Sequence, residues 1–257
     1  MPRFYVSDCS VASEQILITG EDVNHIKNVL RLKIGDEITI CDGAGKEYIC
    51  NIASYETEGV YARICDIQAN AAELPCHITL FQGMPKSDKL EFVIQKAVEL
   101  GVHDIVPVMM ARTVVKLEEK KKEKKLLRYN AIAQSAAKQS GRGRIPCVLP
   151  FQSWKEAMRF ACDYDYILLP YESADGIAYA QDCIRQAARL PEGSKIGIFI
   201  GPEGGFAQEE VQQAKDIGAK VITLGNRILR TETAGLTTLS ILMFEMECYL
   251  NTAQDRG

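Results

Sequence analysis

The sequence predicts an α/β fold with a mostly parallel sheet, preceded by a small β-barrel. From residue 76 onward, apolar runs of strand length alternate with segments of helical period, which is the pattern of βαβ units. Residues 1–70 instead carry short strand-type runs separated by turn signals. Two apolar runs, at 195–200 and 220–224, end in the polar turns GPEGG and GNRILRTE, and each turn leads into a helical pattern.

Length and composition limit the class of protein. A chain of 257 residues with 47% hydrophobic content can hold one large domain, or a small domain and a medium one. The net charge of −4 argues against a protein coated in basic charge, although nucleic-acid binding depends on where charges cluster. The N-terminus lacks the apolar segment of a signal peptide, and no run approaches the roughly 20 apolar residues of a membrane span. We therefore expect a soluble cytoplasmic protein with no membrane partner.

Cysteine usage indicates a reducing compartment and predicts no metal site. The nine cysteines include no C-x-x-C pair, and no histidine stands at zinc-finger spacing. Several, such as Cys50, fall in alternating strand patterns, where a reduced cysteine behaves as a small hydrophobic residue.

The N-terminal region is predicted to contain four strands and one helix. The strands are expected at residues 16–18, 37–41, 46–53 and 60–67, with a turn at DGAG, 42–45. After Glu21 and Asp22, one helical face carries Val23, Ile26, Val29 and Leu30. The residues pointing away from the core are then His25, Lys27 and Arg31. Residues 68–75, which are Ala-rich and end in Pro, are typical of a linker.

The C-terminal region alternates strands and helices. Strands are expected at 78–81, 104–108, 166–169, 195–200 and 220–224, and helices at 89–100 and near 118–139, 152–160, 175–188, 207–217 and 232–250. Ser87 or Asp88 is expected to cap the first helix, with Glu91 completing a capping box. Its inward residues are Leu90, Val93, Ile94 and Ala97. The last helix carries an apolar stripe of Leu236, Leu239, Met243, Met246 and Leu250, which suits burial against the sheet and also against a second subunit; core packing is the simpler interpretation.

The two glycine-containing turns predict a ligand site. Ligands of open α/β sheets bind beyond the carboxyl ends of the strands, where both turns stand. Residues 201–205 match neither the dinucleotide nor the triphosphate loop pattern. The second turn places Arg227, Arg230 and Glu232 between an apolar strand and an apolar helix, and such charges require partners or a ligand. Ordinary strand-to-helix turns, with Thr231 as a helix N-cap, explain part of the pattern.

Residues 112–144 concentrate basic charge. This segment holds eleven Lys and Arg against three Glu, which is a plausible phosphate footprint. The stretch KKKEKK at 120–125 is equally well explained by a solvated helix. Arg142 and Arg144 on the SGRGR loop are better suited to reach phosphates or base edges than to stabilise a fold.

These motifs carry a family resemblance. GPEGGF at 201–206 followed by LGNRILRTETA at 224–234 closely resembles the ribosomal RNA small subunit methyltransferase E family of the SPOUT superfamily. The likeness extends to PRF at 2–4, to His25 and the Arg31-Leu32 pair, to Lys86-x-Asp88-Lys89, and to QSGR at 139–142. It implies an S-adenosylmethionine-dependent enzyme that methylates N3 of one uridine in 16S ribosomal RNA of the small subunit.

The resemblance also implies an organisation and a set of site residues. Residues 1–72 would form a PUA-like, RNA-binding barrel, and residues 73–257 a SPOUT methyltransferase domain with a C-terminal trefoil knot, in a homodimer whose active sites involve both subunits. The expected cofactor-binding residues are Leu169, Pro170, Tyr171, Glu172, Ile200, Gly201, Pro202, Gly204, Gly205, Leu224, Gly225, Asn226, Arg227, Ile228, Leu229, Thr231, Thr233 and Ala234. RNA contacts are expected from Lys138, Arg142 and Arg144 in the basic loop and, by resemblance, from Arg3, His25, Arg31, Lys86, Lys89 and Arg112. His25 is otherwise an ordinary surface helix residue.

The expected chemistry assigns roles to a few charged residues. Methyl transfer from a sulfonium requires an aligned nucleophile and removal of its proton, without a metal or a covalent intermediate. A cation near O2 or O4 would stabilise the uridine anion, which makes Arg230 the first catalytic candidate and Arg227 the second. Glu203 and Glu232 are candidate bases, and each is equally suited to pair with an arginine or to cap a helix. Two other functions stay open: a nucleotide-binding enzyme with a small substrate, and an RNA-binding module whose pocket is a relic.

Overall fold

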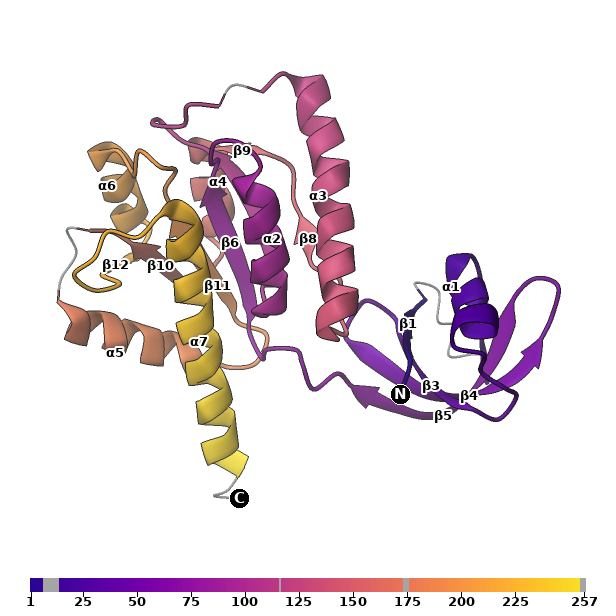
Figure 1. Cartoon of the computed structure of the whole chain (residues 1–257). Helices are drawn as coiled ribbons and strands as arrows, with labels where there is room; N and C mark the ends of the chain where they lie inside the picture. The colour runs from indigo at the N-terminus through magenta and orange to yellow at the C-terminus, as the bar shows by residue number, and fades with distance from the viewer. Residues whose placement is uncertain (7–13, 116, 173–175, 255–257) are drawn as a thin grey trace. The chain divides into compact units, whose positions relative to one another are not determined.

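The computed structural model describes residues 1–6, 14–115, 117–172 and 176–254 (Figure 1). The chain divides into two compact units. The first comprises Met1–Glu73 and Ala137–Ile145, and the second comprises Leu74–Ala136 and Pro146–Gly257. The first unit therefore includes a segment from the middle of the chain, which the predicted boundary after residue 72 did not foresee.

The first unit is built on a five-stranded sheet. Its strands are β1 (Arg3–Tyr5), β2 (Gln15–Ile18), β3 (Glu37–Cys41), β4 (Lys46–Tyr55) and β5 (Val60–Ala69), in the order β1-β3-β4-β5-β2. β1 pairs with β3 in parallel, and the other neighbours are antiparallel. β1 was not predicted, because three residues are too few to show a period of two. Among the described residues no strand pairing joins β1 to β2, so closure of the sheet into a barrel stays a prediction.

The helix of the first unit differs from its predicted form. α1 (Glu21–Asn24) continues as the π-helical segment His25–Val29, and the Leu30 amide donates to the His25 carbonyl at 2.9 Å. Ile26 is buried as predicted, but Val29 and Leu30 are 61% and 38% exposed. A π-helical turn holds more residues than the 3.6 of an α-helix, so a face extrapolated at α-helical period is wrong beyond it.

The second unit contains a seven-stranded sheet. Its strands are β6 (His77–Gly83), β7 (Asp104–Met109), β8 (Cys147–Val148), β9 (Gln152–Ser153), β10 (Tyr166–Pro170), β11 (Lys195–Ile200) and β12 (Lys220–Ile222). The order is β12-β10-β11-β6-β7-β8, with β9 also on β7, and every pair is parallel. The predicted α/β fold with a mostly parallel sheet is confirmed, while the two-residue strands β8 and β9 were not predicted.

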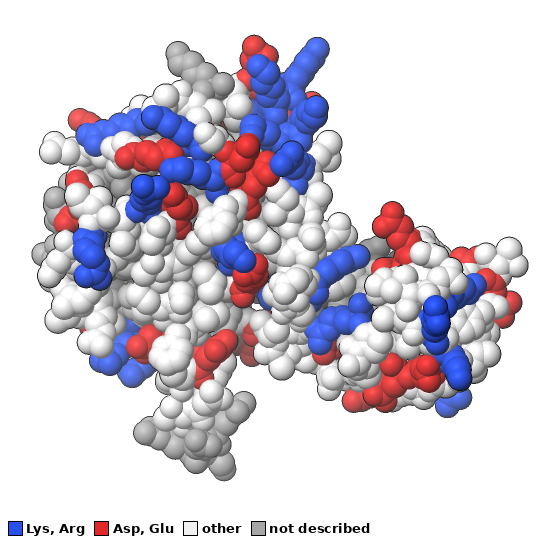
Figure 2. Space-filling view, viewed as in Figure 1, with Lys and Arg blue, Asp and Glu red and all other residues white. Residues whose placement is uncertain are grey.

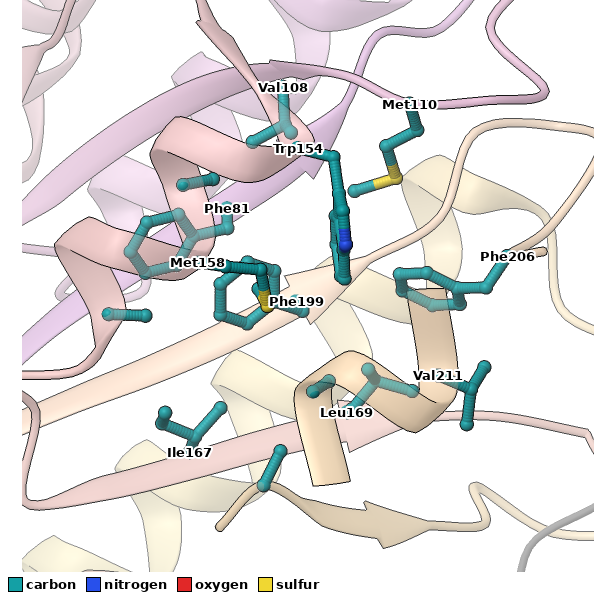
Figure 3. Close-up of a cluster of buried hydrophobic side chains, with 14 of the residues drawn as sticks. Phe81, Val108, Met110, Trp154, Met158, Ile167, Leu169, Phe199, Phe206 and Val211 are labelled. Carbon is teal, nitrogen blue, oxygen red and sulfur yellow. The ribbon is translucent and has the colours of Figure 1, made fainter. Parts of the chain in front are cut away.

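Helices cover both faces of this sheet (Figure 1). They are α2 (Lys89–Glu99), α3 (Glu119–Ser140), α4 (Trp154–Ala161), α5 (Ile177–Ala188), α6 (Gln208–Asp216) and α7 (Thr231–Gln254). On the face of α4 and α6, Phe81 stacks on Phe199 at 4.2 Å between ring centroids, with Trp154 edge-on to Phe199 (Figure 3). α2 and α7 pack together on the opposite face. No helix in the described ranges is long and apolar enough to cross a membrane.

Two helix details correct the sequence prediction. Asp88 precedes α2 but makes no side-chain cap, and the Glu91 carboxylate pairs with Arg128 at 2.7 Å instead of closing a capping box. The four predicted inward residues of α2 are buried. In α7, Leu239 and Met246 are buried, whereas Leu250 lies on the surface, so the predicted stripe is only partly core.

Candidate functional site

A cavity of about 430 Å³ lies in the second unit, beyond the carboxyl ends of three adjacent strands. β12, β10 and β11 are neighbours in the sheet, and their carboxyl ends with the turns that follow supply residues 223–225 and 227–231, 170–172 and 200–206 of the lining. Parallel strands present their carboxyl ends at one edge, so sequence-distant turns form one pocket. A volume of this size is typical of a small-molecule site.

Most of the predicted cofactor-binding residues line this cavity. The exceptions are Leu169, Asn226 and Thr233. Leu169 is fully buried in the core beneath α4 and α6, because alternation along β10 turns its side chain away from the pocket. Asn226 and Thr233 are exposed and lie outside the lining.

Four lining residues were not predicted as part of the pocket. Lys89 and Arg112, expected to contact RNA, both line it, as do Phe206 and Thr223. The Arg112 guanidinium donates to the Gly204 carbonyl at 2.9 Å, and the Phe206 ring contacts Trp154 and Tyr171 edge-on. Phe206 closes the GPEGGF motif, so the sequence carried a signal for it.

Close backbone packing explains the glycines of the first turn. A side chain on Gly201 would place its Cβ 3.1 Å from the Gly205 carbonyl carbon, and Gly205 has a φ of 69°, which favours glycine. The turn therefore presents bare backbone to the cavity, as contact with the edge of a flat heterocycle requires.

The two acidic candidates share one lysine. The Lys89 ammonium lies 3.3 Å from Glu203 Oε1 and 3.4 Å from Glu232 Oε2, and the Lys86 amide donates to Glu203 at 2.9 Å. Burial would raise the pKa of Glu203, but the hydrogen bonds from Lys86 and Lys89 and the lysine charge outweigh it and hold this pKa below its usual value. A carboxylate with a lowered pKa is a weak base. The geometry favours a role for Glu203 in fixing the start of α2.

Two arginines of the second turn are available to a ligand. Arg227 and Arg230 line the cavity with exposed side chains, and neither forms an ion pair with any residue that the structure describes. An unpaired guanidinium at a pocket wall is suited to bind an anion or an oxygen that gains negative charge.

Arg142 does not have the role predicted for it. Its side chain is 3% exposed, and Nε and Nη2 bond the Glu73 carboxylate at 2.9 and 2.7 Å. The amides of Gly143 and Arg144 donate to the same carboxylate at 3.0 and 3.1 Å. The loop is thus docked in the first unit by an ion pair between the buried Arg142 and the half-buried Glu73, and Arg142 is not available to reach RNA.

The remaining RNA candidates vary in their surroundings. Arg3 pairs with Glu47 at 2.6 Å and donates to the Gly141 carbonyl, and the Lys138 ammonium lies 5.8 Å from the centre of the Tyr5 ring. Arg144 is half-buried. The other five, Arg3, His25, Arg31, Lys86 and Lys138, are exposed. Near the start of α3, lysines are interspersed with glutamates (Figure 2), as in Lys121–Glu118 and Lys122–Glu119, which matches a solvated helix.

The described part of the chain contains no candidate metal site and no disulfide. No group of three or more His, Cys, Asp or Glu there is arranged to hold a metal ion. Eight cysteines are described, all as free thiols, and Cys9 lies outside the described residues.

Comparison with known proteins identifies both units. Residues 72–243 match the model of an RNA methyltransferase domain, and residues 18–65 match an RNA methyltransferase PUA domain. The chain is 38% identical over 90% of its length to ribosomal RNA small subunit methyltransferase E of Bacillus subtilis, of which 90% is covered. It is 33% identical to the protein of that name from Mesomycoplasma hyopneumoniae, over 93% of this chain and 98% of that one.

Solved structures of similar proteins indicate the same family. One is a ribosomal RNA small subunit methyltransferase E from Neisseria gonorrhoeae bound to S-adenosyl methionine, with a TM-score of 0.76, 34% identity, and coverage of 95% of this chain and 97% of that one. Another is a putative methyltransferase from Legionella pneumophila in complex with the bound cofactor SAM, with a TM-score of 0.73, 30% identity, and coverage of 94% and 96%. The chain therefore belongs to the family of the ribosomal RNA small subunit methyltransferase E proteins, with an RNA methyltransferase domain and a PUA domain.

Proposed function

We propose that this protein is an S-adenosylmethionine-dependent methyltransferase of small-subunit ribosomal RNA, and that it methylates N3 of a uridine in 16S rRNA. The observation that carries the proposal is the cavity walled by the two motif turns, with Arg227 and Arg230 unpaired among the described residues. The SAM-bound relatives support the choice of cofactor. An rRNA substrate implies a cytoplasmic protein.

The lining suits this cofactor. The turn at 201–205 exposes backbone groups that can bond the polar edge of an adenine, and Ile200, Leu224 and Leu229 supply apolar surface for its faces. The cofactor supplies a methyl group on a positively charged sulfur.

The residues of the chain then have distinct tasks. Arg230 stabilises the negative charge that spreads to O2 or O4 when uridine N3 loses its proton, and Arg227 is the alternative for this role. Lys89 keeps Glu203 and Glu232 in place, so either carboxylate acts as a base only after this ammonium moves away. Both acids stay candidates for the base.

We also propose the knot and the homodimer that the family resemblance implies. The Thr231 hydroxyl bonds the Gly201 carbonyl at 2.6 Å, which fastens the turn after β12 to the turn after β11 and supports a knotted C-terminal segment. Phe92 of α2 and Ile241 and Phe244 of α7 are exposed apolar residues on two helices that pack together, which supports a subunit interface on that face.

Methyl transfer to ribosomal particles tests the function. Small subunits that lack the modification are incubated with the protein and labelled S-adenosylmethionine, and the nucleosides are analysed by mass spectrometry. We expect label on N3 of one uridine of 16S rRNA. Label at another position would overturn the N3 assignment, and no label on rRNA from folded protein would overturn the rRNA activity. Calorimetry tests the alternative of an RNA-binding module, because a module with a relic pocket would not bind S-adenosylmethionine.

A further inference from the structure

A buried glutamine lies behind the cavity. Gln82 stands near the carboxyl end of β6, is fully buried, and does not line the pocket. Its side-chain nitrogen donates to the Gly83 carbonyl at 3.1 Å and to the Thr231 hydroxyl at 2.8 Å. That hydroxyl in turn donates to the Gly201 carbonyl at 2.6 Å. The chain of hydrogen bonds therefore joins the central strand to both turns that wall the cavity.

The two carbonyls at the ends of this series of hydrogen bonds determine which group donates and which accepts in each bond. The carbonyls of Gly83 and Gly201 only accept hydrogen bonds. The single hydroxyl proton of Thr231 goes to Gly201, so its oxygen has to accept from Gln82. The amide of Gln82 is thus oriented with its nitrogen toward Thr231, and an apolar or acidic side chain cannot replace this donor.

Stability alone does not explain a glutamine at this position. Its Oε1 atom is buried and has no hydrogen-bond partner among the described residues. An unsatisfied buried polar atom is destabilising, so a leucine of similar size would avoid a penalty that Gln82 incurs. A Cβ on Gly235 would lie 3.3 Å from Oε1, and one on Gly83 would lie 2.6 Å from the Pro202 nitrogen. The end of β6, the turn after β11 and the start of α7 therefore pack closely around Gln82, with glycines at the points of contact.

We propose that Gln82 is a positioning residue for the methyl-donor site. By holding the Thr231 hydroxyl against the Gly201 carbonyl, it sets the distance between the two turns and the starting point of α7, directly after Arg230. The inference rests on the proposed function, because it assumes that the cavity binds S-adenosylmethionine.

Calorimetric titration of the full chain with S-adenosylmethionine tests this role. We expect Gln82→Leu and Thr231→Val each to weaken binding by about tenfold, since each leaves a buried polar partner unpaired. Thr231→Ser keeps the hydroxyl and should bind within about threefold of the wild type. The matched control is Thr238→Val: Thr238 is also buried in α7, but its hydroxyl donates to the Ala234 carbonyl within the same helix, so binding should be unchanged.

A double variant shows whether Gln82 and Thr231 affect the affinity for S-adenosylmethionine through one series of hydrogen bonds or independently of each other. If the two residues act through one chain of hydrogen bonds, Gln82→Leu combined with Thr231→Val should bind about as weakly as either single variant. Wild-type affinity in both single variants, additive losses in the double variant, or failure of Thr231→Ser to restore binding would overturn the proposal. If Gln82→Leu does not fold, Gln82→Met, which also lacks the amide donor, takes its place, because Thr231 itself lines the cavity. A wild-type protein that does not bind the cofactor would instead overturn the proposed function.

Discussion

At the residue scale, burial decides whether an arginine is available to a ligand. Arg142 is enclosed and has its guanidinium bound by Glu73, whereas Arg230 is exposed at the cavity wall with no ion-pair partner among the described residues. Both stand in glycine-containing motifs. What differs is the acid next to Arg142 in space, which lies 69 positions away in the chain. The sequence around Arg142 therefore does not predict this ion pair.

Replacement of Arg230 tests the assigned catalytic role. Arg230→Ala should lower kcat for rRNA methylation by about 10²- to 10³-fold, because it removes the cation that stabilises the uridine anion, and it should change the affinity for S-adenosylmethionine little. Single-turnover assays with labelled cofactor measure the rate. Arg159→Ala, at an exposed position on α4, is the control and should keep the wild-type rate. Full activity of Arg230→Ala would remove this residue from the mechanism and leave Arg227 as the candidate.

The Arg142–Glu73 pair predicts a dependence of stability on substitution and on pH. Arg142→Ala should lower the free energy of unfolding by about 1–3 kcal/mol, since it leaves a half-buried carboxylate with only the two loop amides as donors. Urea unfolding measures this loss of stability, with Arg63→Ala at an exposed position on β5 as the control.

The same pair predicts a dependence of stability on pH. Burial alone would raise the pKa of Glu73, but Arg142 and the two loop amides hold this pKa below its usual value of 4.5. The contribution of Glu73 is therefore complete above about pH 4.5 and is lost as the pH falls through the lowered pKa.

The variant Glu73→Gln distinguishes protonation of Glu73 from protonation of other carboxylates as the cause of acid sensitivity. This variant should lack the part of the acid-induced loss of stability that the wild type shows as the pH falls from about 4.5 through the lowered pKa of Glu73. An unchanged pH profile in Glu73→Gln, or stability of Arg142→Ala equal to that of Arg63→Ala, would contradict the role of the pair.

At the element scale, periodic segments of the second unit were predictable and short or irregular ones were not. β6, β11 and α2 carry enough apolar residues at a regular period to be recognised. β1, β8 and β9 have two or three residues and depend on neighbours that only the fold brings together. In the site, the glycine turns were recognisable as motifs. Lys89 was assigned to RNA, because no local pattern shows that it pairs with acids from two distant turns.

The end of β6 predicts a strict requirement for glycine. A Cβ on Gly83 would lie 2.6 Å from the Pro202 nitrogen and 2.9 Å from the Gly201 carbonyl carbon, so Gly83→Ala must push the first turn outward. We expect a loss of stability of about 1–3 kcal/mol and weaker binding of S-adenosylmethionine. Thermal unfolding and calorimetry measure the two effects. Gly176→Ala is the matched control, because a Cβ there meets nothing within 4 Å. Equal behaviour of the two variants would show that the turn adjusts without cost.

At the scale of the whole molecule, the first unit is discontinuous in sequence. Residues 137–145 belong to it, although residues on both sides of them belong to the second unit. The Glu73–Arg142 pair, a Tyr5 hydroxyl bond to the Arg142 carbonyl and the bond from the Gly45 amide to the Gly143 carbonyl hold the segment there. Chain order alone predicts one boundary. Only the spatial arrangement shows that the first unit incorporates a second segment.

The exposed apolar face of α2 and α7 makes the proposed homodimer testable. Phe244 is 62% exposed on α7, near the middle of the helix, and burial of a charge at such a position would leave it unpaired in an interface. Phe244→Glu should therefore weaken dimerisation by at least about 100-fold, as measured by sedimentation equilibrium. Leu127→Glu is the matched control: Leu127 is 76% exposed on α3, and its replacement should leave the dimer intact. A monomeric wild type would refute the dimer itself, and a Phe244→Glu variant that dimerises as the wild type does would place the interface on another face.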